Sequence, residues 1–208
     1  MTVKTANKHE LKTRETRTLL LQAAETIFVR DGYEGAELGE IAALAGRTKG
    51  AIYAQFTSKE DIFLALVEDR TKWYRAHMEK ALAKSTTIEG NIAALRTFYQ
   101  ERADEPAWSL LMLEYNLFVM RHPESKKRRK ERLAELLSQE DEQRISAILG
   151  PAAKGSNAIS RVEAVYAFHP LMAALVLEHQ LGTNLTEKDT VKKVFNRIFD
   201  ALLDLPAQ

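Results

Sequence analysis

A short run of side chains near residue 50 carries the clearest chemical signal in the sequence. Arg47, Thr48 and Lys49 place two positive charges and a hydroxyl at the start of a short helical segment, and Gln55 adds an amide further along. Lysine and arginine bind phosphate groups, and arginine, threonine and glutamine also hydrogen-bond to the edges of bases. These residue types at this spacing are typical of a surface that binds nucleic acid.

The elements that position this run are two short helices. Residues 38–45 and 49–56 each have helical apolar spacing, and the turn Ala45-Gly46-Arg47-Thr48 separates them. The side chains expected to pack inward are Leu38, Ile41, Ala42, Ala45, Ile52 and Phe56. Two helices joined by a short glycine-containing turn form a helix-turn-helix, whose second helix meets base edges through its N-terminal residues. The sequence predicts this motif here.

The sequence lacks the residue patterns of the common enzyme and metal sites. It has no cysteine, which excludes disulfides, thiolate ligands and thiol nucleophiles. It also lacks an HExxH motif, a glycine-rich phosphate loop and a serine nucleophile elbow. His77, His122, His169 and His179 have no metal-binding spacing with one another. We therefore expect a protein that is not an enzyme and holds no metal or cofactor.

The region after residue 70 is rich in aromatic and methionine side chains. The candidates for lining a ligand cavity are Trp73, Phe98, Tyr99, Trp108, Met112, Tyr115, Tyr166, His169 and Met172. Apolar walls with a few hydroxyl groups are typical of small-molecule sites. The alternative is that these side chains only fill a core, since they recur at helical spacing.

The predicted fold class is all-α, because nearly every segment has the period of an amphipathic helix. The nine expected helices cover about residues 14–31, 38–45, 49–56, 58–84, 87–102, 106–121, 123–149, 160–182 and 186–204. The sequence also suggests where helices begin: capping boxes at Ser58/Asp61, Ser160/Glu163 and Thr186/Asp189, and a cap at Thr87. Pro170 is expected to kink the eighth helix.

Residues 16–66 resemble the N-terminal domain of the TetR family of transcriptional regulators. The matching landmarks are Ala23-Ala24, Phe28, Gly32-Tyr33, Ile41-Ala42, Ala45-Gly46, Lys49-Gly50, Ile52-Tyr53, Phe56 and Ser58-Lys59-Glu60. Their order and spacing, rather than any single landmark, carry the resemblance. It implies a nine-helix fold, with a helix-turn-helix DNA-binding domain over residues 13–60 and a ligand-binding, dimerising domain over residues 61–206.

The resemblance also implies roles for single residues. Lys49, Tyr53 and Lys59 are expected to contact phosphates; the alternatives are solvated surface lysines and, for Tyr53, an aromatic side chain of the core. Gly50 is expected where the backbone must approach DNA closely, although a packing reason is an alternative. Arg47 either reads a base or faces solvent.

Three positions depart from the family pattern. Ala36 stands where the family usually has a threonine or serine that caps the second helix, and losing such a cap typically costs about 1 kcal/mol. Arg47 replaces a small apolar residue, and Gln55 replaces a histidine or an aromatic residue. The last two changes place the usual DNA contacts of these positions in question.

Two apolar stripes near the C-terminus predict a homodimer through the last two helices. The stripe on the ninth helix is Val191, Val194, Phe195, Ile198 and Leu202, and that on the eighth is Leu171, Ala174, Leu175, Glu178 and Leu181. Four helices from two chains can cover both stripes. The alternative is packing within one subunit.

The sequence has neither a signal peptide nor an apolar run of membrane-spanning length, so a cytoplasmic location is expected, with no membrane partner. The basic run over residues 126–130 is interpreted as a solvated helix face rather than a second nucleic-acid patch. The partners expected are double-stranded operator DNA and a small-molecule effector. The rival interpretation is a DNA-binding regulator of the same fold without a ligand.

Overall fold

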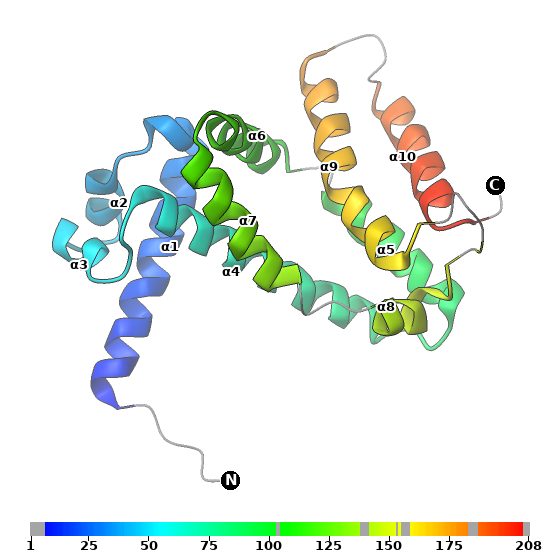
Figure 1. The fold of residues 1–208 in the computed structure, drawn as a ribbon, viewed down its shortest axis with the longest axis horizontal. Coiled ribbons are helices and arrows are strands. Elements are labelled where there is room, and N and C mark those ends of the chain that lie inside the picture. Colours follow the sequence, from blue (N-terminus) through cyan, green and yellow to red (C-terminus); the bar gives the residue numbers. More distant parts are fainter. Residues whose placement is uncertain are drawn as a thin grey trace. The chain divides into compact units, whose positions relative to one another are not determined.

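The computed structural model is all-α, about 82% helical, with no strand among the residues that it describes. These residues are 7–102, 105–137, 142–152, 154, 159–182 and 187–205. They form ten helices (Figure 1): α1 (Lys8–Gly35), α2 (Leu38–Leu44), α3 (Lys49–Tyr53), α4 (Lys59–Leu82), α5 (Ile88–Arg102), α6 (Pro106–Arg121), α7 (Pro123–Leu137), α8 (Glu142–Leu149), α9 (Arg161–Gln180) and α10 (Lys188–Leu202). The helix expected over residues 123–149 corresponds to α7 and α8, and residues 138–141 lie outside the described residues.

Helix α1 is longer at both ends than the sequence pattern indicated. It begins at Lys8, because the Asn7 side chain accepts the Glu10 N–H at 2.9 Å and the Glu10 carboxylate accepts the Asn7 N–H at 3.1 Å. The expected start near residue 14 was therefore wrong. The expected stop at Gly32 marks a real break, since this residue has φ 75° and ψ 174°, but one further helical turn follows to Gly35.

The chain divides into two compact units. Unit 1 consists of residues 1–72 and 111–132, and unit 2 consists of residues 73–110 and 133–208. Helices α4, α6 and α7 each contribute residues to both units. The division into functional domains at residue 60 stays a prediction, because the compact units do not follow a single cut along the chain.

Aromatic rings form the centre of unit 1. The Phe63 ring of α4 lies 5.1 Å from the ring of Phe28 and 5.1 Å from that of Tyr33, measured between centroids. Tyr115 of α6 lies 4.9 Å from Tyr33, and Phe118 lies 4.8 Å from it. Such close, mostly edge-to-face packing holds α1, α4 and α6 together beneath the short helices α2 and α3.

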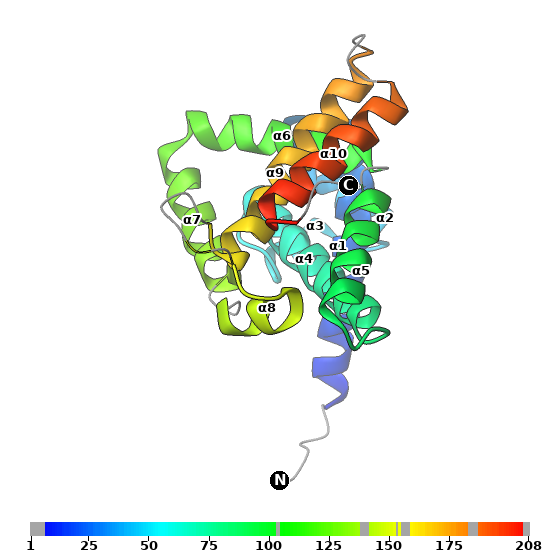
Figure 2. The ribbon, with the colours of Figure 1, turned by 90° about the vertical axis from the view of Figure 1, so that its right-hand side faces the viewer.

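Unit 2 has its own core, built by α5, α8, α9 and α10. Figure 2 shows α9 and α10 running side by side, and these two helices are in contact. Phe168 of α9, Phe195 and Phe199 of α10, and Tyr99 of α5 are all buried in it. Phe195 is 2% exposed, so its predicted place on a dimer stripe was wrong: the side chain is part of the core of its own subunit.

The predicted helix starts were largely confirmed. Ser160 and Glu163 form a capping box on α9, and the Thr87 hydroxyl accepts the Gly90 N–H at 3.0 Å. Ser58 accepts the Asp61 N–H at 3.1 Å, but the Asp61 carboxylate binds the Thr57 N–H rather than closing the box. Thr186 lies outside the described residues. Pro170 lies inside α9.

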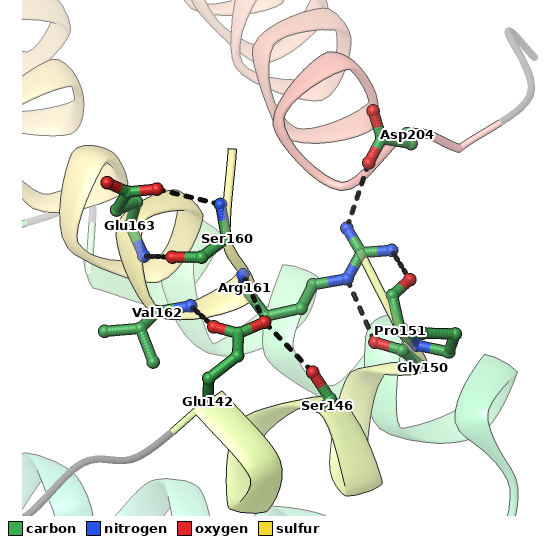
Figure 3. Close-up of polar contacts among 9 residues, drawn as sticks. All are labelled: Glu142, Ser146, Gly150, Pro151, Ser160, Arg161, Val162, Glu163 and Asp204. Carbon is green, nitrogen blue, oxygen red and sulfur yellow. Dashed lines mark hydrogen bonds and ion pairs between the residues drawn. The ribbon is translucent and has the colours of Figure 1, made fainter. Parts of the chain in front are cut away.

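A network of polar contacts joins the ends of α8, α9 and α10 (Figure 3). The Glu142 carboxylate accepts the backbone N–H groups of Arg161 at 2.9 Å and Val162 at 3.0 Å. The buried Arg161 guanidinium donates to the carbonyls of Gly150 and Pro151 and pairs with Asp204 at 3.4 Å. A carboxylate at the positive end of a helix suits both the open N–H groups and the helix dipole.

Candidate nucleic-acid interface

The turn between α2 and α3 has a defined backbone geometry. Gly46 has φ +63°, its N–H donates to the Ala43 carbonyl at 3.0 Å, and the Arg47 N–H donates to the Ala42 carbonyl at 2.8 Å. These two bonds and the left-handed glycine make a Schellman motif, which satisfies the last carbonyls of α2 and reverses the chain. The predicted helix-turn-helix is thus confirmed in its geometry.

Helix α3 begins at a side-chain cap. The Thr48 hydroxyl accepts the Ala51 N–H at 3.3 Å, and the first residues of α3 are exposed. Ile52 and Phe56 are only 0% and 2% exposed, while Tyr53 is 59% exposed. The short helix therefore hides its apolar side in unit 1 and presents Thr48, Lys49, Gly50 and Tyr53 to solvent as one continuous surface, called here the α3 face.

Two glycines shape the surroundings of the α3 face. A Cβ added at Gly39 of α2 would lie 3.0 Å from Cε of Lys49, so the lysine side chain lies across the bare backbone of α2. A Cβ added at Gly50 would meet only the Thr48 hydroxyl, at an ordinary 3.6 Å. Packing within the chain therefore does not require glycine at position 50, and its expected role in a close approach to DNA stays a prediction.

Arg47 and Gln55 flank the α3 face and are both half-buried. The Arg47 guanidinium donates to the Gly46 carbonyl at 3.1 Å, which holds the side chain against the turn. The structure thus places Arg47 beside the start of α3. Whether it reads a base stays a prediction, and so does any contact of Gln55.

Lys59, expected at a phosphate, is engaged inside unit 1. Its ammonium donates to the carbonyls of Glu34 at 2.7 Å and Ala36 at 3.2 Å, and it lies 5.4 Å from the centre of the Tyr33 ring. Burial lowers the pKa of this ammonium below its ordinary value, although Glu34 and Glu37 act in the opposite direction. An ammonium has three donors, so one remains for a phosphate after the two carbonyls are bound.

The start of α2 differs from the expectation for Ala36. The N-cap residue is Glu37, whose side chain makes no capping bond, and Ala36 is 2% exposed. Helix α2 therefore begins without a side-chain cap, as expected, but its N-cap position is residue 37 and not residue 36. Burial of Ala36 and the bond from Lys59 to its carbonyl fix the link between α1 and α2 instead.

The buried carboxylate of Glu60 links α4 to α6 and α7 within unit 1, and the sequence pattern did not predict it. Glu60, in the first turn of α4, is 7% exposed; it accepts the Tyr115 hydroxyl at 3.2 Å and pairs with Arg128 of α7 at 3.3 Å. Burial first, and then the charge of Glu60, raise the pKa of the Tyr115 hydroxyl, which therefore stays protonated and donates. No local pattern signals this pairing, because its members are 55 and 68 residues from Glu60.

Unit 2 contains a small cavity. Its volume is about 40 Å³, and its lining residues are Tyr74, Tyr99, Glu105, Trp108, Ser109, Met172, Ala173 and Val176. Three predicted ligand-site residues, Tyr99, Trp108 and Met172, are thus brought together. Sequence reasoning missed Tyr74 and Glu105, which hydrogen-bond to each other at 3.1 Å.

The other predicted ligand-site residues do not line this cavity. Tyr115 and Met112 belong to unit 1, where Tyr115 packs in the aromatic core. Trp73 is 52% exposed, and its ring packs against that of His77 at a tilt of 32°. Phe98 packs against the core of unit 2. Tyr166 is half-buried in α9, and the side chain of His169 lies outside the described residues.

Within the described ranges, no helix combines the length and apolarity needed to cross a membrane. Over the same residues, no group of three or more His, Cys, Asp or Glu side chains is placed to hold a metal ion.

Comparisons with known proteins agree with this geometry. The sequence profile of "Bacterial regulatory proteins, tetR family" matches residues 20–66, which include α2, α3 and the start of α4. An uncharacterised HTH-type transcriptional regulator of Bacillus subtilis, YwcC, is 29% identical over 118 residues, 53% of each chain. The HTH-type transcriptional repressor BepR of Brucella suis is 47% identical over 53 residues, 26% of this chain and 25% of BepR. The chain thus spans between a quarter and a half of the length of these relatives.

Solved structures share the fold over most of the chain. A putative TetR-family transcriptional regulator from Rhodococcus superposes with a TM-score of 0.67 at 16% identity, covering 91% of this chain and 99% of the other. The transcriptional regulator FadR from Bacillus subtilis, in complex with stearoyl-CoA, superposes with a TM-score of 0.62 at 18% identity, over 91% and 99%. The relatives and structures named here are all described as transcriptional regulators or repressors. Residues 20–66 thus match the tetR family of bacterial regulatory proteins, and the chain as a whole shares the fold of a solved TetR-family structure.

Proposed function

We propose that this protein is a cytoplasmic transcriptional repressor that binds a near-palindromic operator as a homodimer. A small apolar or aromatic molecule, bound in unit 2, releases it from the DNA. The observation that carries the proposal is the α3 face: a capped, exposed helix start that presents Thr48, Lys49 and Tyr53 beside a glycine with no packing role.

The α3 face suits the major groove. Lys49 and Tyr53 are exposed at helical spacing and can reach phosphates, while the start of α3, with Thr48 and Arg47, can approach base edges. Phosphate contacts supply affinity that falls with salt, whereas base contacts supply discrimination. Specific reading therefore depends on Arg47 and Thr48 more than on Lys49.

Dimerisation would supply a second recognition helix for the other half of the operator. The exposed side chains include Leu171 and Ala174 on α9, Leu181 just after it, and Val194 on α10. A second copy related by a two-fold axis would cover these residues with the same patch of its own surface. The two recognition helices must then lie about 34–36 Å apart to enter successive major grooves.

Ligand control requires the cavity of unit 2 to expand. A volume of about 40 Å³ is far below the roughly 300–1,000 Å³ of typical ligand sites. A drug-sized molecule can bind only if the lining side chains and the helices that carry them move apart. A ligand that prefers this expanded state shifts the population towards it. Because α4 carries Tyr74 of the cavity and begins six residues after α3 ends, the expansion would also displace α4.

The experiment that tests DNA recognition is a selection on random duplexes, followed by binding measurements on the enriched sequence and on a scrambled one. We expect a near-palindrome to be enriched and bound at least 10³-fold more tightly than non-specific DNA, as specific regulators usually are. Failure to enrich any sequence at low protein concentration would contradict specific reading.

Ligand release is tested by linkage. The affinity of a bound small molecule is measured with and without saturating operator, because a ligand that weakens DNA binding tenfold must itself be weakened tenfold by DNA. Equal ligand affinity in both conditions would favour the second candidate, a regulator of the same fold without a ligand switch. The smallness of the cavity is the observation that keeps this candidate open.

A further inference from the structure

We propose that the cavity of unit 2 selects an organic cation, through the Glu105 carboxylate and the rings of Tyr74, Tyr99 and Trp108. This inference rests on the proposed ligand-controlled function and names the chemical class of the ligand. It adds a positive charge to the apolar character proposed above.

The carboxylate is fixed at the cavity wall. Glu105 immediately precedes α6, and its Oε2 accepts the Tyr74 hydroxyl of α4 at 3.1 Å. Both residues line the cavity, and both are half-buried. Tyr74 therefore orients the carboxylate, and among the described lining residues Glu105 is the acidic one.

The rings complete a site for a positive charge. Three aromatic side chains from three different helices line the cavity: Tyr74 on α4, Tyr99 on α5 and Trp108 on α6. The faces of tyrosine and tryptophan attract a cation that lies within about 6 Å of the ring centre. Met172 and Val176 of α9 supply apolar contacts for carbon substituents. Aromatic faces, one carboxylate and aliphatic side chains together match an alkylated ammonium group better than a neutral hydrocarbon or an anion.

The cavity volume bears on which cations fit. A volume of about 40 Å³ has room for only a few water molecules, since one water needs roughly 10–15 Å³ of such space. An ammonium head group must therefore displace side chains, and Trp108, which is 8% exposed, is in position to respond. Trp73 is 52% exposed and does not line the cavity, so a Trp73→Phe variant leaves Trp108 as the single tryptophan reporter.

The test compares two probes of the same shape and different charge. Choline carries a trimethylammonium group, and 3,3-dimethylbutan-1-ol has carbon in place of the charged nitrogen. We expect choline to bind at least tenfold more tightly than the neutral alcohol, which corresponds to about 1.4 kcal/mol. Binding is measured by Trp108 fluorescence in Trp73→Phe and by calorimetry on the unmodified chain.

Two matched variants separate local from general charge effects. Glu105→Gln removes the cavity carboxylate, and Glu101→Gln removes an exposed carboxylate of α5 with the same change of net charge. We expect Glu105→Gln to abolish the preference for choline and Glu101→Gln to retain it. Equal binding of the two probes, equal loss in both variants, or no choline binding by the folded protein would each overturn the inference. Operator binding, measured on the same samples, shows separately whether the proposed function holds.

Discussion

The Glu114 carboxylate of α6 accepts a hydrogen bond from the backbone N–H of Tyr33 at 2.9 Å, at the break in α1. The same carboxylate oxygen occupies the space that a Cβ at residue 32 would need. Gly32 has φ +75° and ψ 174°, a region that is essentially restricted to glycine. The glycine thus serves two purposes within unit 1: it permits the break, and it lets a charged side chain reach the freed N–H group.

This relationship predicts a coupled effect on stability. Gly32→Ala should lower the free energy of unfolding by about 1–3 kcal/mol, because alanine adopts this backbone conformation poorly. Glu114→Ala should cost a similar 1–3 kcal/mol, because the Tyr33 N–H loses its partner in a partly buried place. Urea denaturation measures both losses.

The double variant Gly32→Ala/Glu114→Ala measures how much of the stability loss comes from the clash between the new methyl group and the Glu114 carboxylate. With Glu114 truncated, the new methyl group no longer meets the carboxylate, so Gly32→Ala should cost less than in the unmodified chain. Neighbouring residues that touch one another commonly show such non-additivity. Strictly additive losses would show that the carboxylate and the glycine are independent.

Sequence pattern predicted the helices where local signals were strong. The capping box of Ser160 and Glu163, the cap at Thr87 and the turn at Gly46 could all be predicted, because each depends on residues within five positions of one another. The start of α1 was missed although Asn7 and Glu10 have capping-box spacing. The residues that follow are polar and lack an apolar period, so periodicity gave no support there.

Contacts between segments that are distant in the chain could not be predicted from the sequence pattern. Glu114 meets Tyr33 across 81 residues, and Tyr115 meets Glu60 across 55. Tyr115 therefore looked like a candidate for a ligand cavity when only its own helix was considered. Glu105 was missed for the opposite reason: an acidic residue before a proline has the pattern of an ordinary helix start.

Lys49 and Lys59 should differ in their effects on DNA binding. Lys49 is exposed on the α3 face, so Lys49→Ala should weaken binding to all sequences and reduce the slope of log affinity against log salt by roughly 1, as expected when one phosphate is no longer neutralised. Lys59→Ala should instead mainly lower stability, because two carbonyls of the α1–α2 link lose their donor. Filter binding over a salt series and urea denaturation distinguish the two. A larger salt-slope change for Lys59→Ala would restore its assignment as a phosphate-binding residue.

The dimer prediction requires a variant outside the core. Phe195→Glu would unfold unit 2, whereas Leu171 of α9 is 39% exposed and can be changed to glutamate without entering the core. We expect Leu171→Glu to convert a dimer into a folded monomer of 23.5 kDa in sedimentation experiments. Met120→Glu, a change at a 77% exposed residue of α6, is the matched control and should remain dimeric. A dimeric Leu171→Glu would move the interface away from this face of α9.

The network around Glu142 predicts a pH dependence of stability. Burial alone would raise the pKa of this carboxyl, but hydrogen bonds from the Val162 and Arg161 N–H groups and from nearby hydroxyls hold it below its ordinary value of 4.5. An acid whose pKa is depressed by folding stabilises the protein above its unfolded pKa, and this contribution is lost as the pH falls through the folded value. Glu142→Gln keeps an oxygen acceptor but has no charge. The difference in unfolding free energy between the unmodified chain and Glu142→Gln should therefore be constant above about pH 5.5 and shrink as the pH falls below about 4.5. Urea denaturation between pH 3 and 7 measures it, with Glu101→Gln, a change at an exposed residue of α5, as the control. A difference that grows on acidification would mean that the carboxylate form is not the one that the ends of α8 and α9 stabilise.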